Sequence, residues 1–185
     1  MKRIIFILSI TLFFIACNSA STPPAEAAAD TTKVAEVPAA PAVTMPYTPV
    51  YATLTDDVSD ADLLTVLNSY KYWENGDMAS VRSTLGDSVA FHSWNGWEFN
   101  GTGDSLLTYW KLSRDSLSSV KITMGAWRKQ HSPEKNEDWV SVWYDEVDKY
   151  KTGKVDSASY QDDNLVVKGK IRYYSQHKQY QKKKK

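Results

Sequence analysis

Cysteine is nearly absent from this sequence, which has Cys17 and no other cysteine among its 185 residues. A lone cysteine adds no disulfide to an exported domain, so its position needs another explanation. The chain also has no Cys-x-x-Cys pair and no His-Glu-x-x-His motif. Because these patterns build the common zinc sites, we expect neither a metal nor a cofactor.

Nucleotide-binding and serine-hydrolase motifs are missing as well. The chain has no glycine-rich loop followed by Lys and Ser or Thr, and no Gly-x-Ser-x-Gly turn. It has no excess of charge either, since 22 Lys and Arg balance 22 Asp and Glu. No basic stripe interleaved with aromatic residues occurs in its body, so we expect no binding to nucleic acid. The four lysines of residues 182–185 predict a solvated basic tail.

Long apolar runs are missing except near the start of the chain. Lys2 and Arg3 precede an apolar stretch, residues 4–15, which is shorter than the roughly 20 residues that a membrane-spanning helix needs. A basic start with a short apolar segment is typical of a cleaved signal peptide. The alternative is an uncleaved N-terminal anchor with an incidental cysteine.

The end of this segment explains the lone cysteine. The sequence Phe-Ile-Ala-Cys, ending at Cys17, resembles the bacterial lipobox, whose cysteine becomes the lipidated first residue of the mature protein. We therefore predict a lipoprotein signal peptide over residues 1–17 and a lipid such as palmitate on Cys17. The predicted location is the envelope of a Gram-negative bacterium, anchored to a membrane on the periplasmic side or at the cell surface.

Composition divides the rest of the chain. Residues 18–48 are rich in Ala, Pro, Ser and Thr and contain few large apolar side chains. Such a segment buries too little surface to offset its chain entropy, which predicts a disordered tether. Residues 49–181 contain all seven tryptophans and match one domain of typical size, enough to build a substantial core.

Three helices are predicted first in this domain. Ser59 begins a capping-box pattern, and the apolar residues that follow, from Leu63 to Trp73, repeat at helical spacing until Asn75-Gly76. Asp77 begins a second, short helix. A third is predicted from about Asp104 to Arg114.

Strands follow the helices and interrupt them once. Residues 88–99 predict a hairpin with a type I′ turn at Asn95-Gly96. After residue 116, alternation of apolar and polar residues predicts four strands, at residues 118–130, 139–150, 155–167 and 171–177. Helices followed by consecutive hairpins predict an α+β fold in which helices pack on a strongly curved antiparallel sheet.

The order of these elements carries a family resemblance. A helix, Asn-Gly-Asp, a short helix, the segments DSVAFHSWNG and FNGTGDSLLTYW, three long strands and VVKGKI follow one another over residues 59–177. This order resembles the nuclear transport factor 2-like (NTF2-like) superfamily, which includes SnoaL-like cyclases and ketosteroid isomerases. The resemblance implies a cone with a pocket inside, and dimerisation through the outer face of the sheet.

The resemblance also implies two candidate catalytic residues. His92 lies near the position at which the isomerases carry their carboxylate base, and a histidine can serve there because imidazole titrates near neutral pH. Asp162 and Asp163 lie about where the isomerases hold a protonated aspartate. Adjacent strand residues face opposite sides, so at most one of them points inward, and Asp162 is our candidate. The alternatives are a structural histidine and a solvated strand end.

Aromatic residues supply the predicted ligand contacts. We expect Trp73, Trp94, Trp110, Trp143 and Tyr173 to contact a ligand, although their spacing equally fits a purely structural core. Trp127 and Trp139 are expected on the outer face of the sheet, where they would suit a dimer or partner surface.

Three functions fit these observations. The first is a tethered module that binds a small apolar ligand, and the second is an isomerase-like or cyclase-like enzyme with His92 as general base. The third is an interaction domain that pairs with itself, as a homodimer, or with another envelope protein. Because the usual catalytic residues of the resembled family are not in place, we favour non-catalytic binding of a small ligand or a protein partner.

Overall fold

The structure is a computed structural model, and it describes residues 46–179. The predicted signal peptide, the lipid site at Cys17, nearly all of the predicted tether and the tail at residues 182–185 lie outside this range. Within residues 46–179, no helix is long and apolar enough to cross a membrane.

The three predicted helices are present, and each begins at a side-chain cap. Helix α1 spans Asp60–Asn75, α2 spans Met78–Thr84 and α3 spans Gly103–Asp115. The Ser59 hydroxyl oxygen accepts a hydrogen bond from the backbone N–H of Asp62 at 3.0 Å, which satisfies one of the free donors of the first turn. Helix α1 ends at Gly76, whose φ of 74° is the left-handed conformation that glycine adopts without strain.

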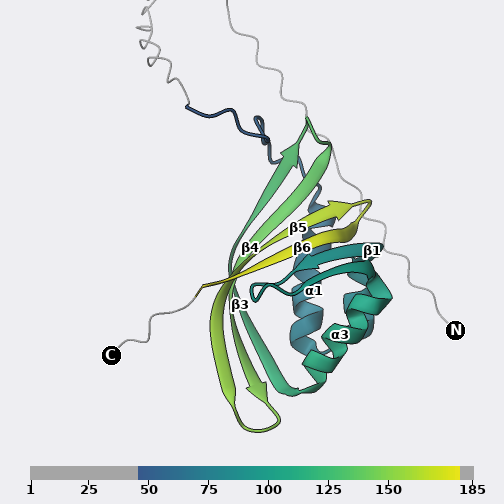
Figure 1. The fold of residues 1–185 in the computed structure, drawn as a ribbon, viewed down its shortest axis with the longest axis vertical. Coiled ribbons are helices and arrows are strands. Elements are labelled where there is room, and N and C mark those ends of the chain that lie inside the picture. Colours follow the sequence, from purple (N-terminus) through teal and green to yellow (C-terminus); the bar gives the residue numbers. More distant parts are fainter. Residues whose placement is uncertain (1–45, 180–185) are drawn as a thin grey trace, which may run out of the picture. The chain divides into compact units, whose positions relative to one another are not determined.

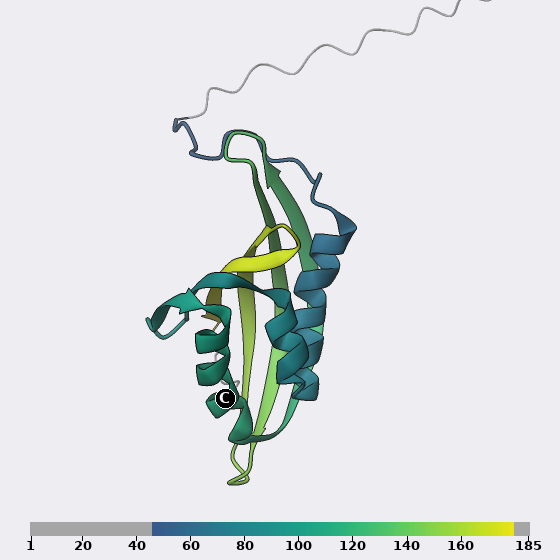
Figure 2. The same ribbon diagram turned by 90° about the vertical axis from the view of Figure 1, so that its right-hand side faces the viewer.

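Six strands form one curved sheet, drawn in Figure 1. They are β1 (Leu85–His92), β2 (Glu98–Thr102), β3 (Leu117–Ser132), β4 (Glu137–Tyr150), β5 (Val155–Val167) and β6 (Lys170–Gln179). Their order across the sheet is β2-β1-β6-β5-β4-β3, and every neighbouring pair is antiparallel except β1 and β6, which are parallel. The predicted α+β class with a strongly curved sheet is confirmed. The helices lie together on one side of the sheet, as Figure 2 shows.

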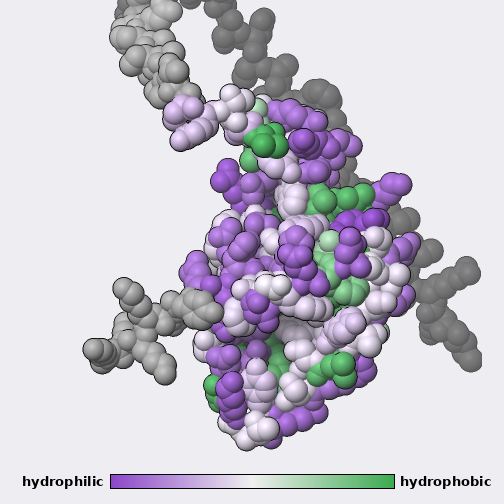
Figure 3. Space-filling model, viewed as in Figure 1, coloured by the Kyte–Doolittle hydropathy of each residue, from purple (hydrophilic) through white to green (hydrophobic). Residues whose placement is uncertain are grey.

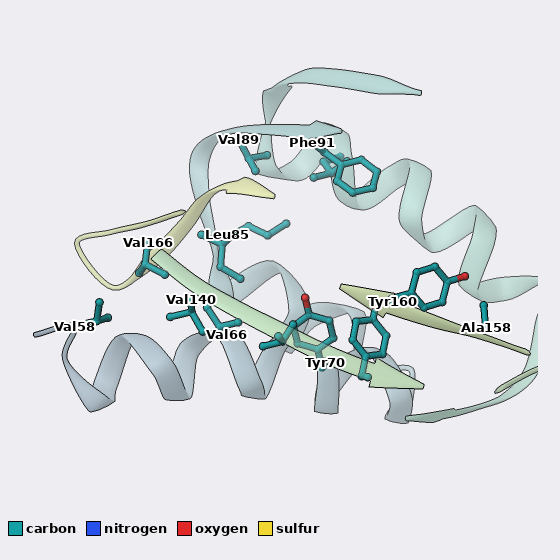
Figure 4. Close-up of a cluster of buried hydrophobic side chains, with 14 residues drawn as sticks. Val58, Val66, Tyr70, Leu85, Val89, Phe91, Val140, Ala158, Tyr160 and Val166 are labelled. Carbon is teal, nitrogen blue, oxygen red and sulfur yellow. The ribbon is translucent and has the colours of Figure 1, made fainter. Parts of the chain in front are cut away.

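The hydrophobic core lies between the helices and this concave side of the sheet. Its fully buried side chains come from both layers, with Val66 on α1 and Leu106 on α3 facing Val140 and Val142 on β4. Figure 4 shows side chains of this cluster directed from the helix and the strands toward one another. Burying one such side chain contributes about 1.5–3 kcal/mol, so the cluster fixes the helices against the sheet.

The turn between β1 and β2 differs from the prediction. The hairpin between β1 and β2 is closed by a hydrogen bond from the Ser93 N–H to the Trp97 carbonyl oxygen at 2.8 Å. Only Gly96 in this loop has a positive φ, of 83°, whereas a type I′ turn needs two such residues in succession, so that prediction was wrong. The pair that does have two positive φ angles is Lys168-Gly169, with 52° and 74°, between β5 and β6.

A β-bulge at Gly125 changes which side chains of β3 face the helices. The pairing of β3 with β4 shifts between Met124 and Ala126, which leaves one extra residue in β3. Beyond the bulge, Trp127 pairs with Val142, a fully buried residue of the concave face. Trp127 therefore lies on the concave face, and the expectation that it covers the outer face was wrong because one inserted residue reverses the alternation.

Candidate functional site

A cavity of about 470 Å³ lies between the helices and the concave face of the sheet. All three helices and strands β1, β3, β4, β5 and β6 contribute side chains to its walls. On the outer surface seen in Figure 3, by contrast, apolar side chains form small separate groups among hydrophilic ones. The cavity is therefore the natural place to look for a ligand site.

Aromatic rings form much of the cavity wall. Trp97 contacts Tyr109 with ring centroids 5.6 Å apart, and Trp110 meets Phe91 nearly edge-on at 5.6 Å. Such edge-to-face pairs hold one another in fixed orientations. Trp97 keeps 37% of its surface exposed, so a flat apolar ring remains available at the mouth of the cavity.

A buried carboxylate and three tyrosines form the inner end of the cavity. Oδ2 of Asp162 accepts hydrogen bonds from the hydroxyls of Tyr70 at 2.9 Å, Tyr144 at 2.8 Å and Tyr174 at 2.6 Å. The three rings line the cavity, whereas Asp162 lies fully buried behind them. Burial raises the pKa of Asp162 from its ordinary 3.8 to about 7, although the three hydrogen bonds lower it. Burial also raises the pKa values of the tyrosines well above their ordinary value, so all three stay protonated.

The tyrosine and amide donors of this cluster are all in use. Each tyrosine has one O–H proton and directs it to Asp162. The amide Nδ2 of Asn164 donates to Val140 O at 3.2 Å and to Tyr70 Oη at 3.4 Å, and Nε2 of Gln176 donates to Tyr144 Oη at 3.1 Å and to Tyr174 Oη at 3.3 Å. Oδ1 of Asn164 is buried and has no partner among the described residues. This end of the cavity therefore has acceptors to offer rather than donors.

A second pair of carboxyl groups lies farther along β4. Glu146 and Asp148 both line the cavity and are hydrogen-bonded to each other, and Glu146 also bonds with Trp73. Burial, together with the nearby charges of Asp148 and Asp162, raises the pKa of Glu146 to about 8. Burial and the charge of Asp156 raise the pKa of Asp148 as well. At neutral pH the pair therefore retains a proton that resides mainly on Glu146.

Lys178 is the one lysine among the residues that line the cavity. Its Nζ lies 3.7 Å from an oxygen of Asp156, 4.6 Å from the ring centroid of Trp94 and 5.7 Å from that of Tyr160. Only 12% of its side chain is exposed. A carboxylate and two aromatic rings thus already hold an ammonium group inside the cavity.

Comparison with known proteins gives a consistent result for the fold. No protein-family model matches the sequence, and no curated protein matches it significantly. Solved structures do match. An NTF2-like protein of unknown function from Exiguobacterium sp. 255-15 superposes with a TM-score of 0.52 at 17% identity, over 62% of this chain and 98% of that one.

Two further structures agree with it. An LEH-like epoxide hydrolase from M. tuberculosis matches with a TM-score of 0.56 at 12% identity, over 65% of this chain and 84% of that one. A protein from Jannaschia sp. CCS1, assigned as a SnoaL-like polyketide cyclase, matches with a TM-score of 0.55 at 9% identity, over 67% and 89% of the two chains. This chain has the NTF2-like fold. The resemblance stated from the sequence is confirmed at the level of the fold, and at these identities it shows nothing about activity.

Within the NTF2-like cone, the predicted aromatic contacts fall into two groups. Trp73, Trp94 and Trp110 line the cavity. Trp143 lies between Val142 and Tyr144, which face the concave side, and strand alternation therefore directs Trp143 to the outer face. It cannot contact a ligand in the cavity.

His92 and Tyr173 are likewise outside the cone. His92 is exposed at the end of β1, and its Nδ1 lies 3.1 Å from the Tyr173 hydroxyl. Tyr173 also packs against Trp139 with ring centroids 5.7 Å apart. Because Phe91 faces the core, its neighbour His92 must face outward. His92 and Asp162, the two predicted catalytic residues, are therefore not brought together, since they lie on opposite faces of the sheet.

Several residues that make the cavity polar were not among the predicted site residues. Tyr144, Glu146 and Asp148 share one face of β4 with the buried Val140 and Val142, and this alternation was visible in the sequence. The contributions of Tyr70 and Tyr174 depend on how α1 and β6 pack on that strand, and no local pattern shows this. Among residues 46–179, no group of three or more His, Cys, Asp or Glu side chains is arranged to hold a metal ion.

Proposed function

We propose that this protein binds a small amphipathic organic molecule inside the cone, and that a lipid on Cys17 holds it at the bacterial cell envelope. The observation that carries the proposal is the cavity of about 470 Å³ with aromatic walls and a polar inner end. Sites for small molecules typically combine mostly apolar walls with a few polar groups that fix orientation. A protein partner or a second copy of the chain on the outer face of the sheet is compatible with this function.

The anchor is supported by the sequence at residues 1–17 and by the single cysteine. The test is metabolic labelling with a radioactive fatty acid in a bacterial host. Labelled protein in the membrane fraction is expected for the natural sequence, and Cys17→Ser should lose both the label and the membrane association. Label that persists in Cys17→Ser would rule out lipidation at this residue.

Ligand binding is tested by native mass spectrometry of the protein purified gently from membranes. We expect a mass excess over the lipidated polypeptide that corresponds to a co-purified small molecule. Ser69→Phe should abolish this excess, because Ser69 lines the cavity and a phenyl group there fills it. Asn68→Phe is the matched control, since Asn68 is the preceding residue of α1 and is exposed. An excess that survives in Ser69→Phe would place the bound molecule elsewhere.

A second candidate is an enzyme that moves a proton beside a carbonyl group, as in the isomerase or cyclase function that the sequence offered as the alternative. The carboxyl pair of Glu146 and Asp148 favours it, because a general base works best when its pKa lies near the working pH. This pair would replace His92 as the base. The test follows deuterium exchange at the α-carbon of cyclohexanone by NMR, with and without protein. Exchange accelerated by the natural protein and lost in Glu146→Gln would support catalysis, and exchange at the solvent rate in both would exclude it for this substrate.

A further inference from the structure

The polar groups at the inner end of the cavity, around Asp162, are unevenly divided between donors and acceptors. The protons of Tyr70, Tyr144 and Tyr174 are all directed to Asp162. Against this, the fully buried Asn164 lines the cavity with an Oδ1 that has no partner among the described residues. A buried acceptor without a partner is energetically unfavourable, so a ligand that brings a donor is favoured over one that brings only acceptors.

A second acceptor without a partner lies at the carboxyl pair of β4. Asp148 shares a hydrogen bond with Glu146, yet its Oδ1 is buried and has no partner within residues 46–179. Unlike the amide of Asn164, this group can carry a full negative charge. A donor that is also positively charged would therefore gain about twice the hydrogen-bond strength of a neutral donor here.

The cations already present do not meet this need. Nε of Arg114 donates to Trp73 O at 3.0 Å and its Nη2 donates to Glu74 O at 3.1 Å, at the end of α1. Nζ of Lys178 lies against Asp156 and the two aromatic rings. Both charges lower the pKa of Asp148 from a distance, but neither forms a hydrogen bond to its Oδ1.

Lys178 also shows which chemistry these walls accept. The ammonium group of Lys178 is bound by one carboxylate and the faces of two rings, with most of its side chain buried. Asp148 offers a second carboxylate in the same cavity, which Trp73 and Tyr150 also line. Aromatic faces beside a carboxylate attract organic cations, and the attraction grows as water is excluded.

We propose, on the basis of the binding function above, that the ligand is an organic monocation with an aromatic or aliphatic body and a protonated amine or guanidinium group. The cationic group lies at Asp148, beside Glu146 and Trp73. The apolar body extends along Trp110 and Tyr174. A neutral polyhydroxyl compound would satisfy the acceptors but would gain nothing from the charge of Asp148.

Two probes of nearly equal shape separate these alternatives. Benzylguanidinium and benzylurea both carry N–H donors on a benzyl group, but only the first is charged. In calorimetric titrations of the natural protein at neutral pH, we expect benzylguanidinium to bind about tenfold or more tightly than benzylurea. The affinity for benzylguanidinium should fall as sodium chloride is added, while that for benzylurea should not. Equal affinities, or tighter binding of benzylurea, would overturn the proposal.

Variants on β4 locate the charge effect. Asp148→Asn should bring the two affinities to within about twofold of each other, because it removes the charge and keeps the shape. Asp145→Asn is the control, since Asp145 is exposed on the outer face of the same strand, where it accepts a hydrogen bond from Ser159. If Asp148→Asn still binds benzylguanidinium much more tightly than benzylurea, Asp148 is not the residue that binds the cationic group.

The salt dependence of the unmodified protein remains decisive if the variant folds poorly. If neither benzylguanidinium nor benzylurea binds, the proposal of a cationic ligand is overturned. The proposal that the cavity binds a small molecule is tested separately, by the mass excess and its loss in Ser69→Phe, because neither result depends on the charge of the ligand.

Discussion

Asp162 and Asp163 are neighbours in sequence and nonetheless belong to different environments. Asp162 faces the concave side, is fully buried and accepts hydrogen bonds from three tyrosines. Asp163 faces the outer side and accepts a hydrogen bond from the Ser141 hydroxyl at 2.5 Å. The same division holds for Tyr174 and Tyr173, and for Trp110 and Trp143. Residue type alone therefore does not make the site: the side of the sheet on which the residue lies decides its chemistry.

The largest expected effect is on stability as a function of pH. The pKa of Asp162 in the folded protein is about 7, above its ordinary 3.8, so between these values the folded state binds more protons than the unfolded state. The free energy of unfolding therefore falls as pH rises from about 4 to 7, by up to about 4 kcal/mol from this group. Urea unfolding at pH 5 and pH 8 should show the fall in the natural protein and in Asp163→Asn.

In Asp162→Asn the free energy of unfolding should fall much less between pH 5 and pH 8. Part of the fall should remain, because the raised pKa of Glu146 acts in the same direction up to about pH 8. The comparison between the two Asn variants cancels the contribution of groups distant from both residues, whereas the charge of Asp163 raises the pKa of Asp162 and the charge of Asp162 raises the pKa of Glu146. Equal pH dependence in the two variants would mean that Asp162 carries no such proton.

A smaller difference is expected between the adjacent tyrosines of β6. Tyr174→Phe removes the 2.6 Å hydrogen bond to Asp162 and should cost about 2 kcal/mol at pH 8, where that carboxylate is charged, and less at pH 5. Tyr173→Phe removes only an exposed contact with His92 and should change stability by less than about 0.5 kcal/mol. Similar costs for the two variants, measured by urea unfolding, would contradict the assignment of the two faces.

The smallest expected effect concerns binding by the tryptophans. Trp110→Ala should weaken the binding of benzylguanidinium about tenfold, because it removes a wall of the cavity. Trp143→Ala should leave the affinity within about twofold, since this ring lies on the outer face. Calorimetric titration of both variants, after circular dichroism has confirmed folding, checks the difference. Equal losses of affinity in the two variants would show that Trp143 affects the cavity indirectly from the outer face.

These contrasts also explain how far the sequence could predict the molecule. The caps at Ser59 and Asp77 and the stop at Gly76 are local signals, and each helix lies where its signals placed it. Strand alternation correctly separates His92 from Phe91. The family resemblance placed His92 near the catalytic position of the isomerases. Strand alternation instead places His92 on the outer face of the sheet, because its neighbour Phe91 is buried.

The remaining errors have two physical causes. Periodicity does not show the extra residue at Gly125, although an isolated glycine inside a strand is itself a local sign of a bulge, so the reversal of alternation at Trp127 depends on a signal other than periodicity. The cluster around Asp162 brings together α1, β4, β5 and β6, which lie up to 104 residues apart between Tyr70 and Tyr174. Such a site depends on tertiary packing and becomes visible only when the strands are in register.

The position of β6 has a consequence for how the chain folds. Although β6 follows all other described strands in sequence, it lies in the middle of the sheet, between β1 and β5, and its parallel pairing with β1 joins segments some 80 residues apart. Until β6 is available, the β1–β2 hairpin has no strand that connects it to the β3–β5 meander. Contacts of such long range slow folding. The domain therefore cannot complete its sheet until residues 170–179 are available, and such a delay would suit the export that we propose.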